Sequence, residues 1–443
     1  MSLDMTAGFL SDELTFNFSG LETGSTPSTE PAFLSQLDNA QIEADVANAL
    51  GANDTLSYHG MLDVLQEAAV GGMTASKFAA LETLVSLLNT PGGISTSAYV
   101  EAISHSLIDG DPANAYWTGG KPHEKPLGDL SATSTQADIE KLIGKWFLGT
   151  DLPSFNHAGE DGTHLTYEVQ KGPLFGPDGA PNYHNINQGV DGDCWFLSTL
   201  ADVALKDPSA IESMITNNGN GTYGVRFFID GTPEYVTVNS ELPMAKVSNN
   251  NNHSLLEFTN GAAGKPIWAE LVEKAFAELN AEPGAIHGQG QTGPLNGYHG
   301  LEGGYANNAL AEITGQNSIS YGASQLVADA AKIGAAFDAG EEVMLSVGNL
   351  PKGYEGDLHP DHVFEVVGYD ANTGEFTIHN PWGSASQSPK EQMTFTMTAQ
   401  QLSGFSCSLT VAEGSFGEHT SPLEASLSSL NEASHAHAHH FLV

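Results

Sequence analysis

The chain of 443 residues is longer than a single hydrophobic core usually supports, so we expect roughly two to four domains. It carries 14 Lys and Arg against 54 Asp and Glu, a formal net charge of −40, which argues against nucleic acid and anionic membranes as partners. No stretch approaches the ~18 consecutive apolar residues of a membrane span, and we expect no membrane insertion.

The N-terminal third of the chain carries helical patterns and no evident chemistry. Residues 1–55 are polar and weakly patterned, and we interpret them as a flexible segment with one helix near residues 40–50. Residues 56–148 are predicted to form a small helical module. Its helices are expected from the N-cap Thr74 to Asn89, over 95–107 and over 136–147. A regulatory pro-segment, a substrate-binding module and a spacer all remain open as its role, and regulation is slightly favoured.

Residues 150–413 mix helical and strand patterns. Helices are predicted over 194–204, 266–279 and 324–339, and a β-hairpin over 223–238 with its turn at Asp230-Gly231. The glycine-rich stretch 284–304 is interpreted as a hinge. Strands are predicted over 342–347, 363–369, 375–379, 393–397 and 406–411.

The segment Gln188-Gly-Val-Asp-Gly-Asp-Cys-Trp-Phe-Leu places Cys194 at the start of an apolar helical run. The N–H groups and positive end of a helix favour the thiolate, which is the attacking species in acyl transfer. A free cysteine is usually a buried structural residue, but Gln188, Gly192 and Asp193 at fixed offsets favour a nucleophile here. Gln188 and the backbone N–H of Cys194 are the candidate donors to an oxyanion.

These residues resemble the active-site signature of the calpain family, Gln-Gly-x-x-Gly-Asp-Cys-Trp-Phe-Leu. Trp268–Asn280 is similar to the family's Leu-Glu-Lys-Ala-Tyr helix, and Tyr223–Pro243 to its paired strands. The resemblance covers residues 150–413. It implies an α+β, papain-like fold of two lobes, a helical lobe with the cysteine at about 150–300 and a β-rich lobe with a histidine and an asparagine at about 301–413. It also implies a cysteine endopeptidase that hydrolyses proteins or peptides through a thioacyl-enzyme.

The chain has 17 histidines, and the residues alone do not rank them as general base. The resemblance selects His362, which opens the strand Asp361-His-Val-Phe-Glu-Val-Val-Gly, with His359 as the main rival. Asn380, in Asn-Pro-Trp-Gly, matches the family's asparagine and would orient the histidine, while Trp382 would cover their hydrogen bond from water. Adjacent antiparallel strands would bring His362 and Asn380 together.

Calcium is implied by the resemblance, because calpains bind one calcium in each lobe of the core. The chemistry itself requires no cofactor. In the first lobe Asn185, an uncharged amide, aligns with a ligand acid of the family, and Glu273 and Glu282 are the remaining candidate ligands. The loop after Trp382 lacks the family's carboxylate. Calcium prefers several charged oxygen ligands, so we expect activity that survives chelation or responds only to millimolar calcium.

Residues 414–443 form a low-complexity tail that ends in Phe-Leu-Val. This ending resembles the uncleaved signal of bacterial type I export substrates, and the start of the sequence has no standard secretory signal. We therefore expect the type I export machinery as a partner and a secreted protein, with a cytoplasmic one as the alternative. The cluster from His435 to His440 is interpreted as a solvated tail rather than a metal site.

Two other functions remain open. One is a catalytically silent calpain-like binding module, and the other is a Cys-dependent acyltransferase that uses the same site with an amine acceptor. The second cysteine, Cys407, lies in an apolar strand and is interpreted as structural. Two cysteines, one of them reactive, do not fix the redox compartment.

Overall fold

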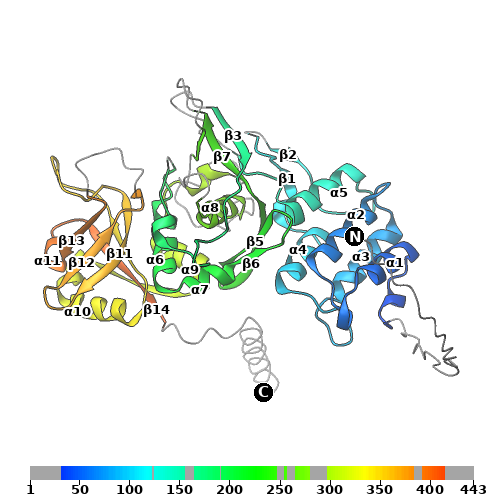
Figure 1. Cartoon of the computed structure of the whole chain (residues 1–443), viewed down its shortest axis with the longest axis horizontal. Coiled ribbons are helices and arrows are strands. Elements are labelled where there is room, and N and C mark those ends of the chain that lie inside the picture. The colour runs from blue at the N-terminus through cyan, green and yellow to red at the C-terminus, as the bar shows by residue number, and fades with distance from the viewer. Residues whose placement is uncertain are drawn as a thin grey trace, which may run out of the picture.

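A computed structural model of the chain describes residues 31–121, 124–154, 164–189, 191–246, 254–256, 265–279, 297–383 and 392–414. Three hydrophobic clusters form its cores, and the parts that they hold together lie in a row in Figure 1, with the blue N-terminal helices at one end and the yellow and red strands at the other. Glu282, the tail from residue 415 and most of the expected hinge at 284–304 fall outside the described residues.

The first cluster holds the N-terminal helices together, and we call residues 31–148 the helical module. The helices expected from residues 74, 95 and 136 are confirmed, and the Thr74 side chain accepts from the Lys77 N–H as an N-cap. The helix expected near residues 40–50 is confirmed as well, and Phe33, Leu37 and Ile42 are buried in this cluster, so the described residues from 33 onward belong to the module. The elements of the module are η1 (Leu34–Gln36), α1 (Ala40–Ala49), η2 (Ala52–Asp54), α2 (Tyr58–Ala69), α3 (Ala75–Ser86), α4 (Ala98–Ile108), η3 (Pro112–Ala115), β1 (Tyr116–Trp117), β2 (Lys125–Pro126), α5 (Gln136–Ile143) and the π-helical η4 (Gly144–Leu148).

The second cluster surrounds the helix that begins at Cys194. The hairpin turn is confirmed: Asp230 and Gly231 have φ values of 50° and 78°, as a two-residue turn with both central residues left-handed requires. α9 belongs to this cluster, so the part with Cys194 extends past the expected boundary near residue 300. The elements here are β3 (His164–Val169), η5 (Tyr183–Asn185), α6 (Cys194–Lys206), α7 (Pro208–Met214), β4 (Ile215–Asn217), β5 (Thr222–Ile229), β6 (Thr232–Asn239), β7 (Glu241–Lys246), β8 (Ser254–Leu256), α8 (Trp268–Leu279), η6 (Tyr298–Leu301) and α9 (Ala306–Thr314).

The third cluster lies in an antiparallel six-stranded sheet of order β13-β12-β11-β10-β14-β9. Five of these strands match the predicted ones within a few residues, and β9 was not predicted. One face of the sheet packs against α10 and α11, and β11 contacts α6. The elements are β9 (Asn317–Gly322), α10 (Ala323–Ala339), β10 (Val343–Val347), β11 (His362–Asp370), β12 (Glu375–His379), β13 (Thr394–Thr398), α11 (Ala399–Leu402) and β14 (Cys407–Glu413).

The helical module packs against the β5–β6 hairpin, on the side away from α6 in Figure 1. The Tyr58 hydroxyl donates to the backbone oxygen of Phe147, and the Tyr99 hydroxyl lies 2.7 Å from Thr237 Oγ1. A Cβ atom at Gly224 would lie 2.5 Å from the Tyr99 ring, so only glycine permits this approach. Within the described residues no helix combines the length and the apolar character needed to cross a bilayer.

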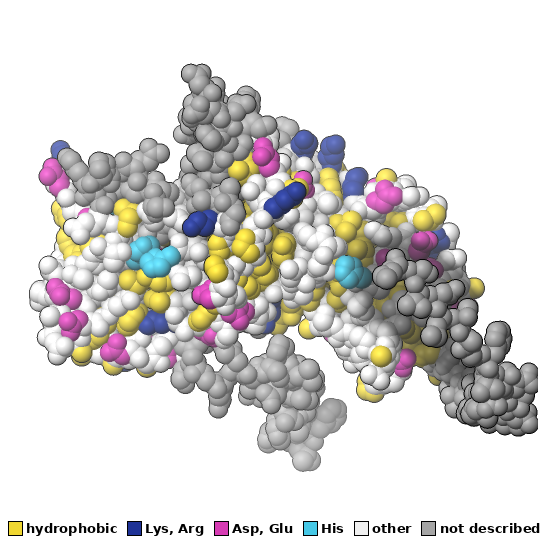
Figure 2. All heavy atoms as spheres, viewed as in Figure 1, with side chains coloured by type: hydrophobic (Ala, Val, Ile, Leu, Met, Phe, Trp, Pro, Cys, Tyr) yellow, Lys and Arg dark blue, Asp and Glu magenta, His cyan; other side chains and the backbone are white. Residues whose placement is uncertain are grey.

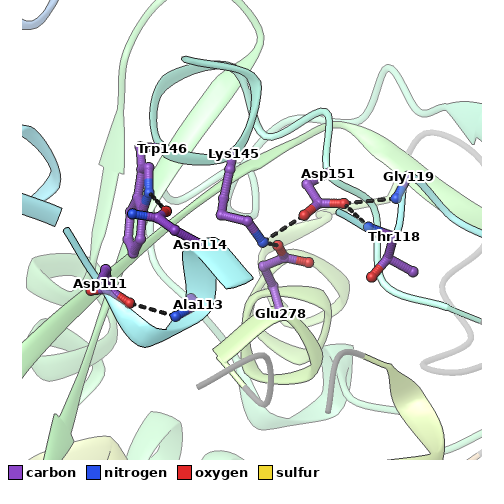
Figure 3. A network of polar contacts seen from close by, with 9 residues as sticks. All are labelled: Asp111, Ala113, Asn114, Thr118, Gly119, Lys145, Trp146, Asp151 and Glu278. Atoms are coloured by element: carbon purple, nitrogen blue, oxygen red, sulfur yellow. Dashed lines mark hydrogen bonds and ion pairs between the residues drawn. The ribbon is translucent and has the colours of Figure 1, made fainter. Parts of the chain in front are cut away.

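A buried ion-pair network fastens the module to α8 (Figure 3). Lys145 Nζ lies 2.5 Å from Asp151 Oδ2 and 3.6 Å from Glu278 Oε1, and the three side chains are at most 7% exposed. Asp151 Oδ1 also accepts from the backbone N–H groups of Thr118 and Gly119 at 2.8 and 2.7 Å. Burial alone would lower the pKa of Lys145, but the two carboxylates outweigh it and raise that pKa. The lysine is therefore charged inside the protein.

Candidate active site

Cys194 is the first residue of α6, and its side chain is buried. The backbone N–H groups of Val363, Trp195 and Cys194 itself lie within hydrogen-bonding reach and lower its pKa, but burial outweighs them and raises that pKa to about 11. The stabilisation expected from the helix N-terminus is therefore insufficient by itself. In this conformation the sulfur is a protonated thiol at neutral pH.

His362 and Asn380 meet as the two-strand argument predicts. Asn380 Oδ1 lies 3.0 Å from His362 Nε2, and both residues are buried. The Trp382 ring lies with its centroid 4.9 Å from that of His362, and the Trp382 backbone N–H donates to Asn380 Oδ1 at 3.2 Å. The Asn380 carbonyl therefore fixes the ring orientation, and Nδ1 is left for proton transfer.

Burial lowers the pKa of His362 to about 4, with a further lowering by His359 and an opposing rise from Asn380. A neutral imidazole is the form that can accept a proton. Together with the raised pKa of Cys194, this favours an uncharged thiol and imidazole over a preformed ion pair.

Cys194 and His362 line one cavity of ≈ 490 Å³. The Ser198 hydroxyl of α6 donates to the Val363 carbonyl of β11 at 2.8 Å, which holds the helix that begins at Cys194 against the strand that begins at His362. His359, the rival candidate for the base, packs at a tilt against Trp382 with ring centroids 4.3 Å apart and is not among the described residues that line the cavity. The geometry therefore favours His362.

Gln188 directs its side-chain amide toward the loop that precedes Cys194. Its Nε2 donates to the Asp191 carbonyl at 2.7 Å and to Asp193 Oδ1 at 3.3 Å, and its backbone N–H donates to the Pro381 carbonyl at 2.8 Å. The side chain is buried and is not among the described residues that line the cavity. Its role as an oxyanion donor stays a prediction, and it requires the amide to turn.

Asp193 and Glu273 form a buried acidic pair that the sequence analysis missed. Burial raises the pKa of Asp193, and the carboxyls of Glu273 and Asp191 raise it further. A hydrogen bond joins the Asp193 and Glu273 side chains, so the pair holds a proton. The Gly-Asp-Cys motif drew attention to Asp193, but nothing in the sequence indicated that Glu273 of α8 would contact it.

Two of the residues considered for the implied calcium, Asn185 and Glu273, contact other protein groups in the structure. Asn185 Oδ1 accepts from the Trp268 indole N–H at 3.0 Å, and Glu273 contacts Asp193. Within the described part of the chain no group of three or more Asp, Glu, His or Cys could hold a metal ion. Roles of Glu273 and Glu282 in calcium binding stay predictions.

A second pair, Glu365 and His379, also escaped the sequence analysis. They lie directly opposite each other on β11 and β12, where His379 Nδ1 bonds Glu365 Oε1. Burial raises the pKa of Glu365, and His379 opposes this rise. His379 immediately precedes Asn380, so the pair fixes the strand from which Asn380 extends.

Comparison with known proteins points to one family. Residues 166–390, just over half of the chain, match the family model described as calpain family cysteine protease. The chain is 28% identical over 232 residues to the calpain-type cysteine protease DEK1 of Arabidopsis thaliana, covering 48% of this chain and 9% of that protein. It is 32% identical over 136 residues to calpain clp-4 of Caenorhabditis elegans and 28% identical over 144 residues to the calpain-2 catalytic subunit of Bos taurus. These matches cover 30% and 31% of this chain, and 16% and 19% of the relatives. The chain thus spans less than a fifth of the length of these three relatives.

Proposed function

Because the chain belongs to the calpain family of cysteine proteases, we propose that it is an endopeptidase that hydrolyses protein or peptide substrates, with Cys194 as nucleophile, His362 as general base and Asn380 as the residue that orients His362. The observation that carries the proposal is the shared cavity of Cys194 and His362, together with the 3.0 Å contact between His362 and Asn380. A papain-like arrangement of two lobes, with the substrate extended across the cavity, is part of this proposal.

The mechanism begins with transfer of the Cys194 proton to His362 as the sulfur attacks the substrate carbonyl carbon. The backbone N–H of Cys194 and, after rotation, the Gln188 amide stabilise the oxyanion. The carbon–nitrogen bond then breaks, His362 protonates the leaving amine, and a thioester remains on Cys194. His362 next takes a proton from water, whose oxygen displaces the sulfur and releases the acid, and the thiol is regenerated.

The direct test compares the purified chain with Cys194→Ala on casein. We expect cleavage by the first and none by the second. If neither cleaves, the assay is repeated with an active-site alkylating probe, and a chain that also resists the probe would favour the silent binding module. An amine acceptor in the reaction separates hydrolysis from acyl transfer, because an acyltransferase would give amide products in place of the free acid.

Calcium dependence is a separate proposal. It rests on the missing carboxylates at Asn185 and in the loop after Trp382. We propose that activity survives a chelator or responds only to millimolar calcium, since the amide of Asn185 hydrogen-bonds an indole. Casein cleavage with chelator and across a calcium titration tests this. Full activation at micromolar calcium would contradict it.

Export through a type I route is proposed from the sequence of the tail alone. The test moves residues 414–443 onto a reporter in a bacterium with a type I exporter. Reporter in the medium supports export and a secreted protein, and reporter retained in the cell supports the cytoplasmic alternative.

The role of the helical module is constrained by its position. Described residues of the module contact the β5–β6 hairpin and α8, and none lines the cavity with Cys194 and His362. We therefore propose that the module supports the fold rather than occluding the site. A site-specific cut between the module and the rest of the chain, with the pieces still associated, is expected to leave the rate of casein cleavage unchanged. A large rise in rate would favour the regulatory role.

A further inference from the structure

The wall of the active-site cavity suggests which substrates it takes. The part contributed by the six-stranded sheet carries neutral hydroxyl groups. Ser346 lies opposite Ser408 on neighbouring strands, and Ser320 lies opposite Thr410 with their hydroxyl oxygens 3.1 Å apart. Directly opposed residues point to the same face of a sheet, so these hydroxyls form one polar, uncharged surface.

One carboxylate interrupts this neutral surface. Among the described residues that line the cavity, Asp361 is the only Asp or Glu, and no Lys or Arg is present. Its side chain is exposed, and its neighbour in the chain is the buried His362. In the described cavity, therefore, no cation neutralises the Asp361 carboxylate.

The backbone fixes the position of Asp361. Its φ of 51° places it in the left-handed region, and its N–H donates to the Gly348 carbonyl at 3.3 Å. Consecutive Cα atoms are about 3.8 Å apart, so the Cα atom of Asp361 lies next to that of His362, and both residues line the cavity. An extended substrate advances about 3.3–3.6 Å per residue, so a side chain within two residues of the scissile bond can reach it.

From this geometry we propose that the cavity selects polypeptides with Lys or Arg within two residues of the scissile bond, and that Asp361 is the residue responsible. The inference rests on the proposed function, since it assumes that peptide bonds are cleaved at Cys194. The net charge of −40 acts in the same direction, because a negative field draws cationic segments toward the protein. On the face shown in Figure 2 acidic side chains are scattered over the surface, so the negative field is not confined to the cavity. A preference for a cation at one position of the substrate must therefore come from the cavity itself.

The test uses four sets of fluorogenic peptides, one set for each of the two positions before and the two positions after the scissile bond. Within a set the peptides differ only at that position, which holds Lys, Gln or Glu. At one position at least, we expect the full chain to prefer Lys over Gln by about three- to fivefold in kcat/KM, as for a solvent-exposed ion pair. Glu should be the poorest at that position. The preference should shrink as salt is raised.

Asp361→Asn is the decisive variant, because asparagine tolerates the left-handed backbone and removes only the charge. In this variant the kcat/KM values for the Lys and Gln peptides should become equal. Glu355→Gln removes an exposed charge from the same loop, outside the described cavity lining, and should preserve the ratio. Equal rates for Lys and Gln at all four positions, or a ratio that persists in Asp361→Asn, would overturn the proposal while leaving the peptidase intact. Absence of cleavage of every peptide, or equal cleavage by Cys194→Ala, would overturn the proposed function instead.

Discussion

Replacing Lys145 by methionine removes the cation of the network in Figure 3 and leaves Asp151 and Glu278 facing each other. Methionine preserves most of the side-chain volume, so the loss is mainly electrostatic. The lysine and its partners are at most 7% exposed, which makes this a buried ion pair and not a surface one. Removing one partner of such a pair costs about 3–5 kcal/mol in free energy of unfolding.

Urea unfolding followed by tryptophan fluorescence measures this loss, since the buried Trp146 directly follows Lys145 in the chain. Lys141→Met is the matched control, because Lys141 makes only an exposed ion pair with Asp138 and should cost less than about 1 kcal/mol. Adding Asp151→Asn and Glu278→Gln to Lys145→Met should recover most of the stability, because the buried charges are then gone. The reasoning is refuted if Lys145→Met costs no more than the control, or if the triple variant is as unstable as the single one.

Three further predictions concern the active site. In a Cys407→Ser background, the rate of Cys194 alkylation by iodoacetamide should rise about tenfold per pH unit from pH 7 to 10, because a pKa of about 11 leaves about 0.1% thiolate at pH 8; a plateau that begins near neutral pH would indicate a preformed ion pair. His362 has a folded pKa of about 4, below its ordinary value of 6.5, so its contribution to stability is complete above pH 6.5 and is lost as the pH falls toward 4. That contribution is on the order of 3 kcal/mol, and urea midpoints should fall less steeply over this range in His362→Gln than in the wild type, whereas parallel slopes would contradict it. Gln188→Ala should lower kcat about 10²–10³-fold with little change in KM if the amide turns to the oxyanion, and an unchanged kcat in a peptide assay would assign Gln188 to the support of the Asp191–Asp193 loop alone.

Much of the local structure around the candidate site was predictable because its signals are local, whereas the choice of His362 and Asn380 depended on the resemblance to calpains. The helix that begins at Cys194, the Asp230-Gly231 turn and the strands that carry His362 and Asn380 each depend on neighbouring residues, and the structure contains them. The antiparallel pairing of β11 and β12 then follows from their short connection.

The missed features depend on contacts between distant parts of the chain. Lys145 pairs with Glu278, and Asp193 with Glu273, and no periodicity links either pair. In the module, Tyr99 lies on the buried stripe of α4 that also packs in the module's own core, so the helical pattern cannot separate residues that fill a core from residues that dock. Glu365 was hidden in the same way, within a strand of mostly apolar residues.

The close approach of Tyr99 to Gly224 limits which segments of this chain can be exchanged with those of a relative. A chimera that places a relative's catalytic segment behind this module would need glycine at the position of Gly224, since any other side chain would meet the tyrosine ring. Conversely, a catalytic segment cut free of the module would expose Gly224 and the surrounding hairpin surface to solvent. A chimera should therefore take the hairpin and the module from the same protein.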